Sequence, residues 1–205
     1  RRTENLQEVP ITVNTLTGKA MQNIFVAGED VRALSARIPS LNVESSNGRL
    51  APRFYIRGLG NTDFDLAASQ PVSVIVDEVV LENVLLKSTP IFDVDRVEVL
   101  KGPQGTLFGR NTPAGIVKFD TRRPTFEEEG YGTLAYGNRT TVTAEGAFSG
   151  PLVDDVLAIR VSGLLQRRDD FIDNAITGED DALGGYTEFA GRVQLLFTPN
   201  EKFEA

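Results

Sequence analysis

Cysteine and histidine are both absent from this chain of 205 residues. Without cysteine there is no disulfide, no iron–sulfur ligand and no thiol nucleophile. Cysteine usage therefore does not indicate whether the protein lies in an oxidising or a reducing compartment. The absence of both residue types excludes the usual zinc and copper sites, and also the serine–histidine and cysteine–histidine arrangements of hydrolytic enzymes. Paired carboxylates of the kind that hydrolyse sugars do not stand out by motif. We therefore expect no metal, no cofactor and no enzyme.

Long apolar runs and net positive charge are also missing. No stretch reaches the about 18 apolar residues of a transmembrane helix. No basic-then-apolar leader opens the chain, so we expect any secretory signal to have been removed. The formal net charge is −8, which disfavours a nucleic-acid partner. The acidic clusters fall in expected connections, where solvated turns are favoured over calcium sites; they are 127–129, 154–155, 169–170 and 179–181.

The run from Arg96 to Asn111 carries the most information of any segment that is present. It opens with alternating charged and apolar residues, the period of a half-buried strand. Gly102-Pro103 ends this strand, because proline donates no ladder hydrogen bond and glycine permits positive φ. A glycine-punctuated turn follows, and we expect a new strand to begin at Ala114-Gly115.

Residues 1–123 mix short strands with helical stretches, an order of elements typical of a small α+β domain. Asn47-Gly48 is a strong turn signal, and a hairpin is expected to turn at Asp77-Glu78. The expected helices are 18–25 and 28–38, the second of them with Val31, Leu34 and Ile38 at helical spacing. The expected strands are one within 6–16, then 41–44, 53–57, 72–77 and 79–82.

From Gly130 onward the pattern indicates strands only. Three long segments, 141–149, 156–168 and 186–198, each alternate between an apolar and a polar face. Two interpretations fit this alternation: a soluble antiparallel sheet with one solvated face, or an outer-membrane barrel whose apolar residues face lipid.

The connections favour the barrel. Tight turns are expected at 150–154 and from residue 198, with a longer polar loop at 172–185 between them. Short turns on one side and long loops on the other are typical of outer-membrane barrels. Aromatic residues near strand ends fit either interface girdles or ordinary core and edge positions; they are Tyr131, Tyr136, Phe171, Tyr186 and Phe197.

Four blocks, in order, resemble the TonB-dependent outer-membrane receptors. They are 10–13 with 30–34 and 38–41, then 54–58, then 74–77, and finally 96–115, with 121–124 leading onward. The resemblance implies an α+β plug domain at 1–124, followed at 125–205 by antiparallel β-strands of an incomplete transmembrane β-barrel. Family barrels have about 22 strands, whereas about four are expected here at roughly ten residues each. The chain is therefore expected to be a fragment, with the family's TonB box lying just before Arg1.

Two positions depart from the family pattern. Glu78 stands where the hairpin after Asp77 usually carries glycine, and glutamate disfavours the positive φ of a tight turn. We therefore expect that loop to be reshaped. Ile116 replaces a second glycine after Ala114-Gly115, a change that leaves the fold intact.

The resemblance implies energised uptake of a scarce nutrient across the outer membrane of a Gram-negative bacterium. The nutrient would be an iron–siderophore, cobalamin or an oligosaccharide, and the plug would gate the barrel lumen. The implied partners are TonB, acting through the missing TonB box, the small nutrient ligand and outer-membrane lipid. The alternative is a soluble β-rich ligand-binding module, which would fold as a monomer without an exposed apolar sheet face.

The resemblance also assigns roles to residues. Arg57 and Arg96 match family arginines that lock the plug to barrel-wall glutamates, and an internal salt bridge is the alternative for Arg96. Glycines and a proline serve turns and close packing; they are Gly58, Gly102, Pro103, Gly105, Gly109 and Gly115. A phosphate loop at 102–109 is disfavoured, because the Gly-Lys-Ser/Thr ending is missing. Polar groups for ligand contact, or plain solvated loops, are Asn47, Arg49, Asn61, Asp63 and Asp65.

Overall fold

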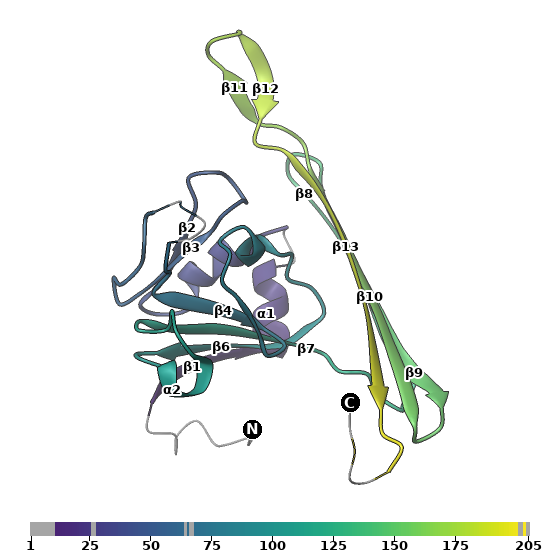
Figure 1. The fold of residues 1–205 in the computed structure, drawn as a ribbon. Coiled ribbons are helices and arrows are strands. Elements are labelled where there is room, and N and C mark those ends of the chain that lie inside the picture. Colours follow the sequence, from purple (N-terminus) through teal and green to yellow (C-terminus); the bar gives the residue numbers. More distant parts are fainter. Residues whose placement is uncertain (1–10, 26–27, 64, 66–67, 201–202, 204–205) are drawn as a thin grey trace. The chain divides into compact units, whose positions relative to one another are not determined.

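The computed structural model describes residues 11–25, 28–63, 65, 68–200 and 203 (Figure 1). The chain divides into two compact units. Unit 1 comprises Arg1–Phe25, Glu29–Thr89 and Val94–Thr121. Unit 2 comprises Val26–Gly28, Pro90–Asp93 and Arg122–Ala205. No helix among the described residues is long and apolar enough to cross a membrane.

Unit 1 is built on a five-stranded sheet of order β1-β6-β7-β4-β5. Its strands are β1 (Thr12–Thr17), β4 (Val72–Val76), β5 (Val79–Leu81), β6 (Val94–Lys101) and β7 (Gly115–Thr121). The β4–β7 pair is parallel and the other pairs are antiparallel. The central strands bury apolar side chains such as Val97, Ile116 and Phe119, and this burial drives the unit to fold. The start of the expected first strand, residues 9–10, lies outside the described residues.

Short helices and a second strand pair complete unit 1. The pair is β2 (Leu41–Glu44) with β3 (Arg53–Ile56); both strands were expected, the second of them one residue longer. The helices are α1 (Gly18–Phe25), the 3₁₀ turns η1 (Val31–Ala36) and η2 (Leu86–Ser88), and the single-turn α2 (Gly105–Phe108). The α1 helix was expected, but α2 lies inside the run that predicted only a turn.

The expected helix at 28–38 is wrong in length and type, because only the 3₁₀ turn η1 forms there. The Asp30 carboxylate caps its start by accepting from the Arg32 amide at 2.9 Å. Its end comes where the Arg37 and Ile38 amides share the Leu34 carbonyl, both at 3.0 Å. Val31, Leu34 and Ile38 are nevertheless buried on one side, so the spacing identified the buried face correctly.

The β4–β5 hairpin keeps its tight turn, and the expected reshaping at Glu78 is wrong. Val76 pairs with Val79, so the loop has only two residues, Asp77 at φ 44° and Glu78 at φ 73°. Two positive φ angles define the turn type that suits a twisted hairpin. The Asp77 carboxylate supports it by accepting from the amide and hydroxyl of Thr121 at 2.8 and 2.6 Å, and Lys118 Nζ lies 3.3 Å from Glu78.

Unit 2 contains a four-stranded antiparallel sheet of order β13-β10-β9-β8. Its strands are β8 (Glu129–Gly137), β9 (Thr141–Val153), β10 (Leu157–Arg168) and β13 (Tyr186–Phe197). Among the described residues the two edge strands, β8 and β13, do not pair with each other, so the sheet is unclosed. The expected architecture is confirmed: an α+β unit is followed by antiparallel strands that form an unclosed sheet.

Two connections in unit 2 differ from expectation. The turn expected at 150–154 comes later, because β9 continues to Val153. Pro151 is tolerated there since the pairing of β8 with β9 has already ended at Ser149, which leaves a single ladder. The loop expected at 172–185 contains a hairpin of β11 (Ile172–Asn174) and β12 (Glu179–Leu183), which extends beyond the ends of β10 and β13 (Figure 1).

Candidate functional site

The sheet of unit 2 buries its polar face and exposes its apolar face. Along β10 the buried residues include Arg160, Ser162 and Gln166, whereas the intervening Val161 is 46% exposed. The exposed apolar side chains of the sheet are Leu134, Tyr136, Phe148, Leu152, Val153, Val161, Leu165, Phe189, Val193, Leu195 and Phe197. A sheet in a water-soluble protein does the reverse, with its apolar face packed on the core. The observed arrangement is that of a barrel wall whose outside contacts lipid.

Five aromatic residues were expected near strand ends, and they do not form one set. Tyr136 and Phe197 are exposed on the apolar face. Tyr131 and Tyr186 lie on the polar face, where their hydroxyls bond to Glu145 and to the Gly28 carbonyl. Phe171 lies under the guanidinium of Arg139, whose carbon is 3.8 Å from the ring centroid. The girdle interpretation therefore suits only part of the set.

A buried ionic cluster occupies the polar face, and Asp93 is its centre. Arg160 on β10 donates to both carboxylate oxygens of Asp93, from Nε at 2.8 Å and from Nη2 at 2.6 Å. The two side chains are 1% and 0% exposed. Such a two-point arginine–carboxylate contact fixes both position and orientation.

The neighbouring strands complete the cluster. Glu129 on β8 accepts from Arg160 Nη1 at 3.0 Å. Glu145 on β9 accepts from the Asp93 amide at 2.9 Å and from the Tyr131 hydroxyl. Arg192 on β13 donates to the Phe92 and Asp93 carbonyl oxygens at 3.0 and 3.1 Å, and its guanidinium carbon lies 4.6 Å from the Phe92 ring centroid. All four strands of the sheet therefore contribute a charged group.

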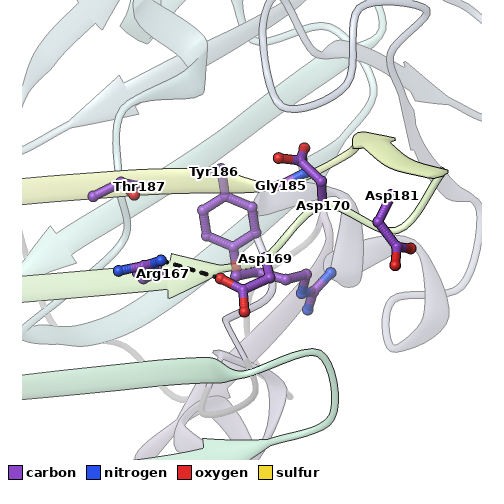
Figure 2. Close-up of a pocket in the computed structure, with 8 residues that line it drawn as sticks. Arg167, Asp169, Asp170, Asp181, Gly185, Tyr186 and Thr187 are labelled. Atoms are coloured by element: carbon purple, nitrogen blue, oxygen red, sulfur yellow. Dashed lines mark hydrogen bonds and ion pairs between the residues drawn. The ribbon is translucent and has the colours of Figure 1, made fainter. Parts of the chain in front are cut away.

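An open pocket of about 660 Å³ lies where β10 ends and β13 begins. Figure 2 shows the residues that line it, with Arg167 pointing toward Asp169 across an ion pair of 3.2 Å. Gly185 closes one wall by donating its amide to Asp170 Oδ1 at 2.7 Å. The lining is polar and carries both signs of charge; it comprises Arg167, Arg168, Asp169, Asp170, Asp181, Gly185, Tyr186 and Thr187.

Metal chemistry receives no support from the described part of the chain. There, no group of three or more acidic, histidine or cysteine side chains lies close enough together to hold a metal ion. Two of the acidic side chains of the pocket bond to neighbouring groups instead, Asp169 to Arg167 and Asp170 to the Gly185 amide.

Arg57 and Arg96 occupy different environments in unit 1. Arg57 is exposed, and its guanidinium donates to Thr12 Oγ1 at 3.4 Å. Arg96 donates to Asp120 Oδ2 at 2.8 Å and lies 3.4 Å from Glu98. Burial raises the pKa of Asp120, but hydrogen bonds from Lys118 and Arg96 outweigh this effect and hold that pKa below its usual value.

The five residues expected to offer ligand contacts lie in loops of unit 1. Asn61 binds its own loop at both ends of its amide, donating to the Ser69 carbonyl and accepting from the Asp63 amide, each at 2.9 Å. Asp63 in turn accepts from the Asp65 amide at 2.9 Å. Asn47 begins the turn closed by the Leu50 amide at 3.2 Å, and Arg49 lies inside it.

The glycine-rich run serves backbone geometry. A side chain at Gly115 would place Cβ 2.2 Å from the Leu100 carbonyl oxygen, so β6 and β7 approach too closely there for any other residue. Positive φ angles occur at Gly58, Gly102, Gly109 and Gly115. Gly105 begins α2, and a Cβ added there would meet only Thr112 Oγ1, at 3.9 Å; Pro103 precedes that helix.

The cluster around Asp93 was not predicted from the sequence. The signal available was the presence of Arg160, Arg192 and Glu145 in the middle of long alternating strands, where a charge is costly unless it is paired. Nothing in the sequence marks Asp93 as their partner, since it lies 67 residues before Arg160.

An α+β unit followed by an unclosed antiparallel sheet with an exposed apolar face defines a plug-and-barrel protein of the outer membrane. Residues 5–116 match the family described as the TonB-dependent Receptor Plug Domain. This match covers more than half of the chain. The chain belongs to the TonB-dependent receptor family, and this places it in the outer membrane of a Gram-negative bacterium.

Known receptors resemble the chain in sequence and structure. It is 34% identical over 168 residues to the pesticin receptor of Yersinia enterocolitica, covering 80% of this chain and 24% of that receptor. It is 36% identical over 77 residues to the ferrioxamine B receptor of Salmonella typhimurium, covering 37% and 11% respectively. The ferric yersiniabactin uptake receptor from Yersinia pestis superposes with a TM-score of 0.81 at 28% identity, covering 93% of this chain and 29% of that one. The chain thus spans about a quarter of the pesticin receptor's length.

Proposed function

We propose that this chain is the plug and the first barrel strands of a receptor for energised uptake of a ferric siderophore. The plug would close the lumen, and TonB would supply the force that opens it. Two relatives, whose names identify them as ferrioxamine B and ferric yersiniabactin receptors, support this ligand class over cobalamin or an oligosaccharide.

The observation that carries the proposal is the inverted sheet of unit 2. Its exposed face is apolar, and its buried face holds charged groups. A barrel wall around a polar interior requires this arrangement. The alternative, a soluble β-rich binding module, requires the apolar face to be covered. The exposure of Phe189 at 83% and of Leu134 at 79% disfavours it.

This proposal assigns a role to each part of the chain. Residues 1–124 would form the plug and residues 125–205 the beginning of the wall. Arg57, being exposed, has a guanidinium available for a carboxylate on a later part of the wall. Arg96 already binds Asp120, so a role in locking would require it to exchange partners. The polar loops around Asn47 and Asn61 would face the ligand.

Uptake measurements test the proposal. The complete receptor that carries this chain would be produced in a Gram-negative host lacking its own siderophore receptors, with and without TonB. We expect accumulation of radioactive iron from at least one ferric siderophore, abolished by loss of TonB or by a protonophore. A receptor that reaches the outer membrane yet raises uptake of no ferric siderophore would contradict the ligand class. Uptake that persists without TonB would contradict the mechanism.

A further inference from the structure

The stretch Pro90–Asp93 has an unusual place in the molecule. It belongs to the same compact unit as the strands β8, β9, β10 and β13, although the residues on both sides of it, Thr89 and Val94, belong to unit 1. Val94 is the first residue of β6, which lies second in the sheet of unit 1. Pro90–Asp93 therefore packs with these strands, although β6 follows it directly in the chain.

We propose that Asp93 is a positioning residue that holds this stretch on the strands through its charge. The ion pair of Asp93 with Arg160 is named here the Asp93 clamp. The clamp must open before Pro90–Asp93 can leave the polar face of the sheet. Its existence is independent of what the receptor transports, and only its part in gating rests on the proposed function.

Charge, more than packing, gives the clamp its strength. Both oxygens of the Asp93 carboxylate bind Arg160, and Oδ2 also lies 3.5 Å from Arg192 Nη2. If Asp93 left, Arg160 would keep Glu129, whose side chain is 53% exposed. Removing the buried partner of a buried arginine strongly destabilises the folded state, because water does not replace the lost contact.

The backbone at Asp93 shows that the surroundings impose its position. Asp93 has a φ of 49°, a left-handed conformation that is costly for a residue with a side chain. The conformation is held from both sides, since the Asp93 amide donates to Glu145 and its carbonyl accepts from the Arg122 amide at 3.0 Å. Release of the whole stretch would relieve this strain, but it would also leave the buried Arg160 without its buried partner.

The clamp reverses the polarity that the family resemblance implied. The resemblance placed the arginines on the plug and the carboxylates on the wall. Here the carboxylate is on the stretch before β6, and Arg160 and Arg192 are on the strands. Arg96 cannot substitute for this contact while it binds Asp120 within unit 1.

Amide hydrogen exchange on the whole chain in detergent micelles tests the clamp. The variant Asp93→Asn keeps the shape of the side chain and removes its charge. Asp95→Asn is the matched control, because Asp95 lies two residues away and is exposed. We expect exchange in the peptides covering 90–93 and Arg122 to rise by about a hundredfold in Asp93→Asn. Exchange in the peptides of β4 and β7 should remain unchanged, and Asp95→Asn should match the parent throughout.

A double variant keeps the test decisive if Asp93→Asn unfolds the chain. Arg160→Gln combined with Asp93→Asn leaves no unpaired buried charge, so it should fold and should release Pro90–Asp93 less than either single variant. Unchanged exchange at 90–93 in Asp93→Asn would overturn the proposal. Equal acceleration across all peptides of the double variant would also overturn it. Either failure would leave the uptake proposal standing, since no transport is measured.

Discussion

The hydroxyl of Tyr186 donates a hydrogen bond of 2.7 Å to the carbonyl oxygen of Gly28, a residue 158 positions earlier in the chain. Gly28 has a φ of 74°, and a Cβ added there would lie 2.4 Å from that same hydroxyl. The contact thus requires glycine at position 28 for two reasons: the backbone is left-handed there, and the Tyr186 hydroxyl leaves no room for a side chain. Together with the Asp93 clamp, it ties a second short stretch of the first half of the chain to the strands of unit 2.

Substitution of Gly28 by alanine is expected to destabilise unit 2 by about 2 kcal/mol, from the left-handed φ and the overlap with Tyr186. Tyr186→Phe should cost about 1 kcal/mol through the lost hydrogen bond. The pair should be less than additive, because removing the hydroxyl relieves the overlap. Urea unfolding in detergent measures these changes. Gly132→Ala is the control, since nothing lies within 4 Å of its added Cβ. A Gly28→Ala variant as stable as Gly132→Ala would contradict this account.

The two-residue turn at Asp77 and Glu78 leads to a prediction about backbone strain. Glu78 has a φ of 73°, and its ion pair with Lys118 is partly exposed. Glu78→Gly and Glu78→Ala both lose the ion pair, but only glycine relieves the strain. We expect the glycine variant to be more stable than the alanine variant by about 1 kcal/mol. Thermal unfolding of the two variants decides the matter, and equal or reversed stabilities would show that the turn is unstrained.

Lys87 makes the stability of unit 1 depend on pH. Its side chain is 3% exposed, and its ammonium group donates to the Val72 carbonyl at 3.1 Å. Burial lowers the pKa of Lys87 from 10.5 to about 8, although the charge of Glu82 acts in the opposite direction. The folded chain therefore releases this proton at a lower pH than the unfolded chain does.

The sign of the effect follows from proton binding. Between pH 8 and 10.5 the unfolded chain holds the Lys87 proton and the folded chain does not, so stability rises with pH in that window. The contribution amounts to about 3 kcal/mol over the whole window and is lost as pH falls toward 8. Comparing the parent with Lys87→Met isolates it, since other groups titrate in both. We expect the parent to gain stability relative to the variant from pH 8 to 10.5, and parallel curves would refute the assignment.

The strand positions in unit 2 were predictable because alternation is a local property. Val161 and Ser162 point to opposite faces wherever the strand lies, and the structure places them so. Which face is buried was not predictable from alternation alone, because a soluble sheet and a barrel wall share the same pattern. The turn expected at Gly150 failed for a related reason: β10 still pairs with Gly150 and Pro151, which extends β9 beyond the local turn signal.

The candidate site was less predictable than the fold. Arg96 could be identified from the sequence because it lies in a long, ordered motif. Its partner Asp120 could not, because the two residues meet only when β6 and β7 pair. Asp93 lies beside that motif and carries the cluster, but its partner Arg192 is 99 residues away. Such long-range charge pairing depends on tertiary structure, and a single sequence contains no periodicity that reports it.

The most direct test of the account measures which face of the β8 strand contacts hydrocarbon. The chain contains no tryptophan, so a single introduced tryptophan is a clean fluorescent probe. Leu134 and Thr133 are adjacent exposed residues on opposite faces, Leu134 on the apolar face and Thr133 on the face of Glu145. Detergent with brominated alkyl chains quenches only tryptophans that it touches. We predict strong quenching of Leu134→Trp and weak quenching of Thr133→Trp. Equal quenching, or a soluble monomer that needs no detergent, would contradict the claim that the apolar face of this sheet faces lipid.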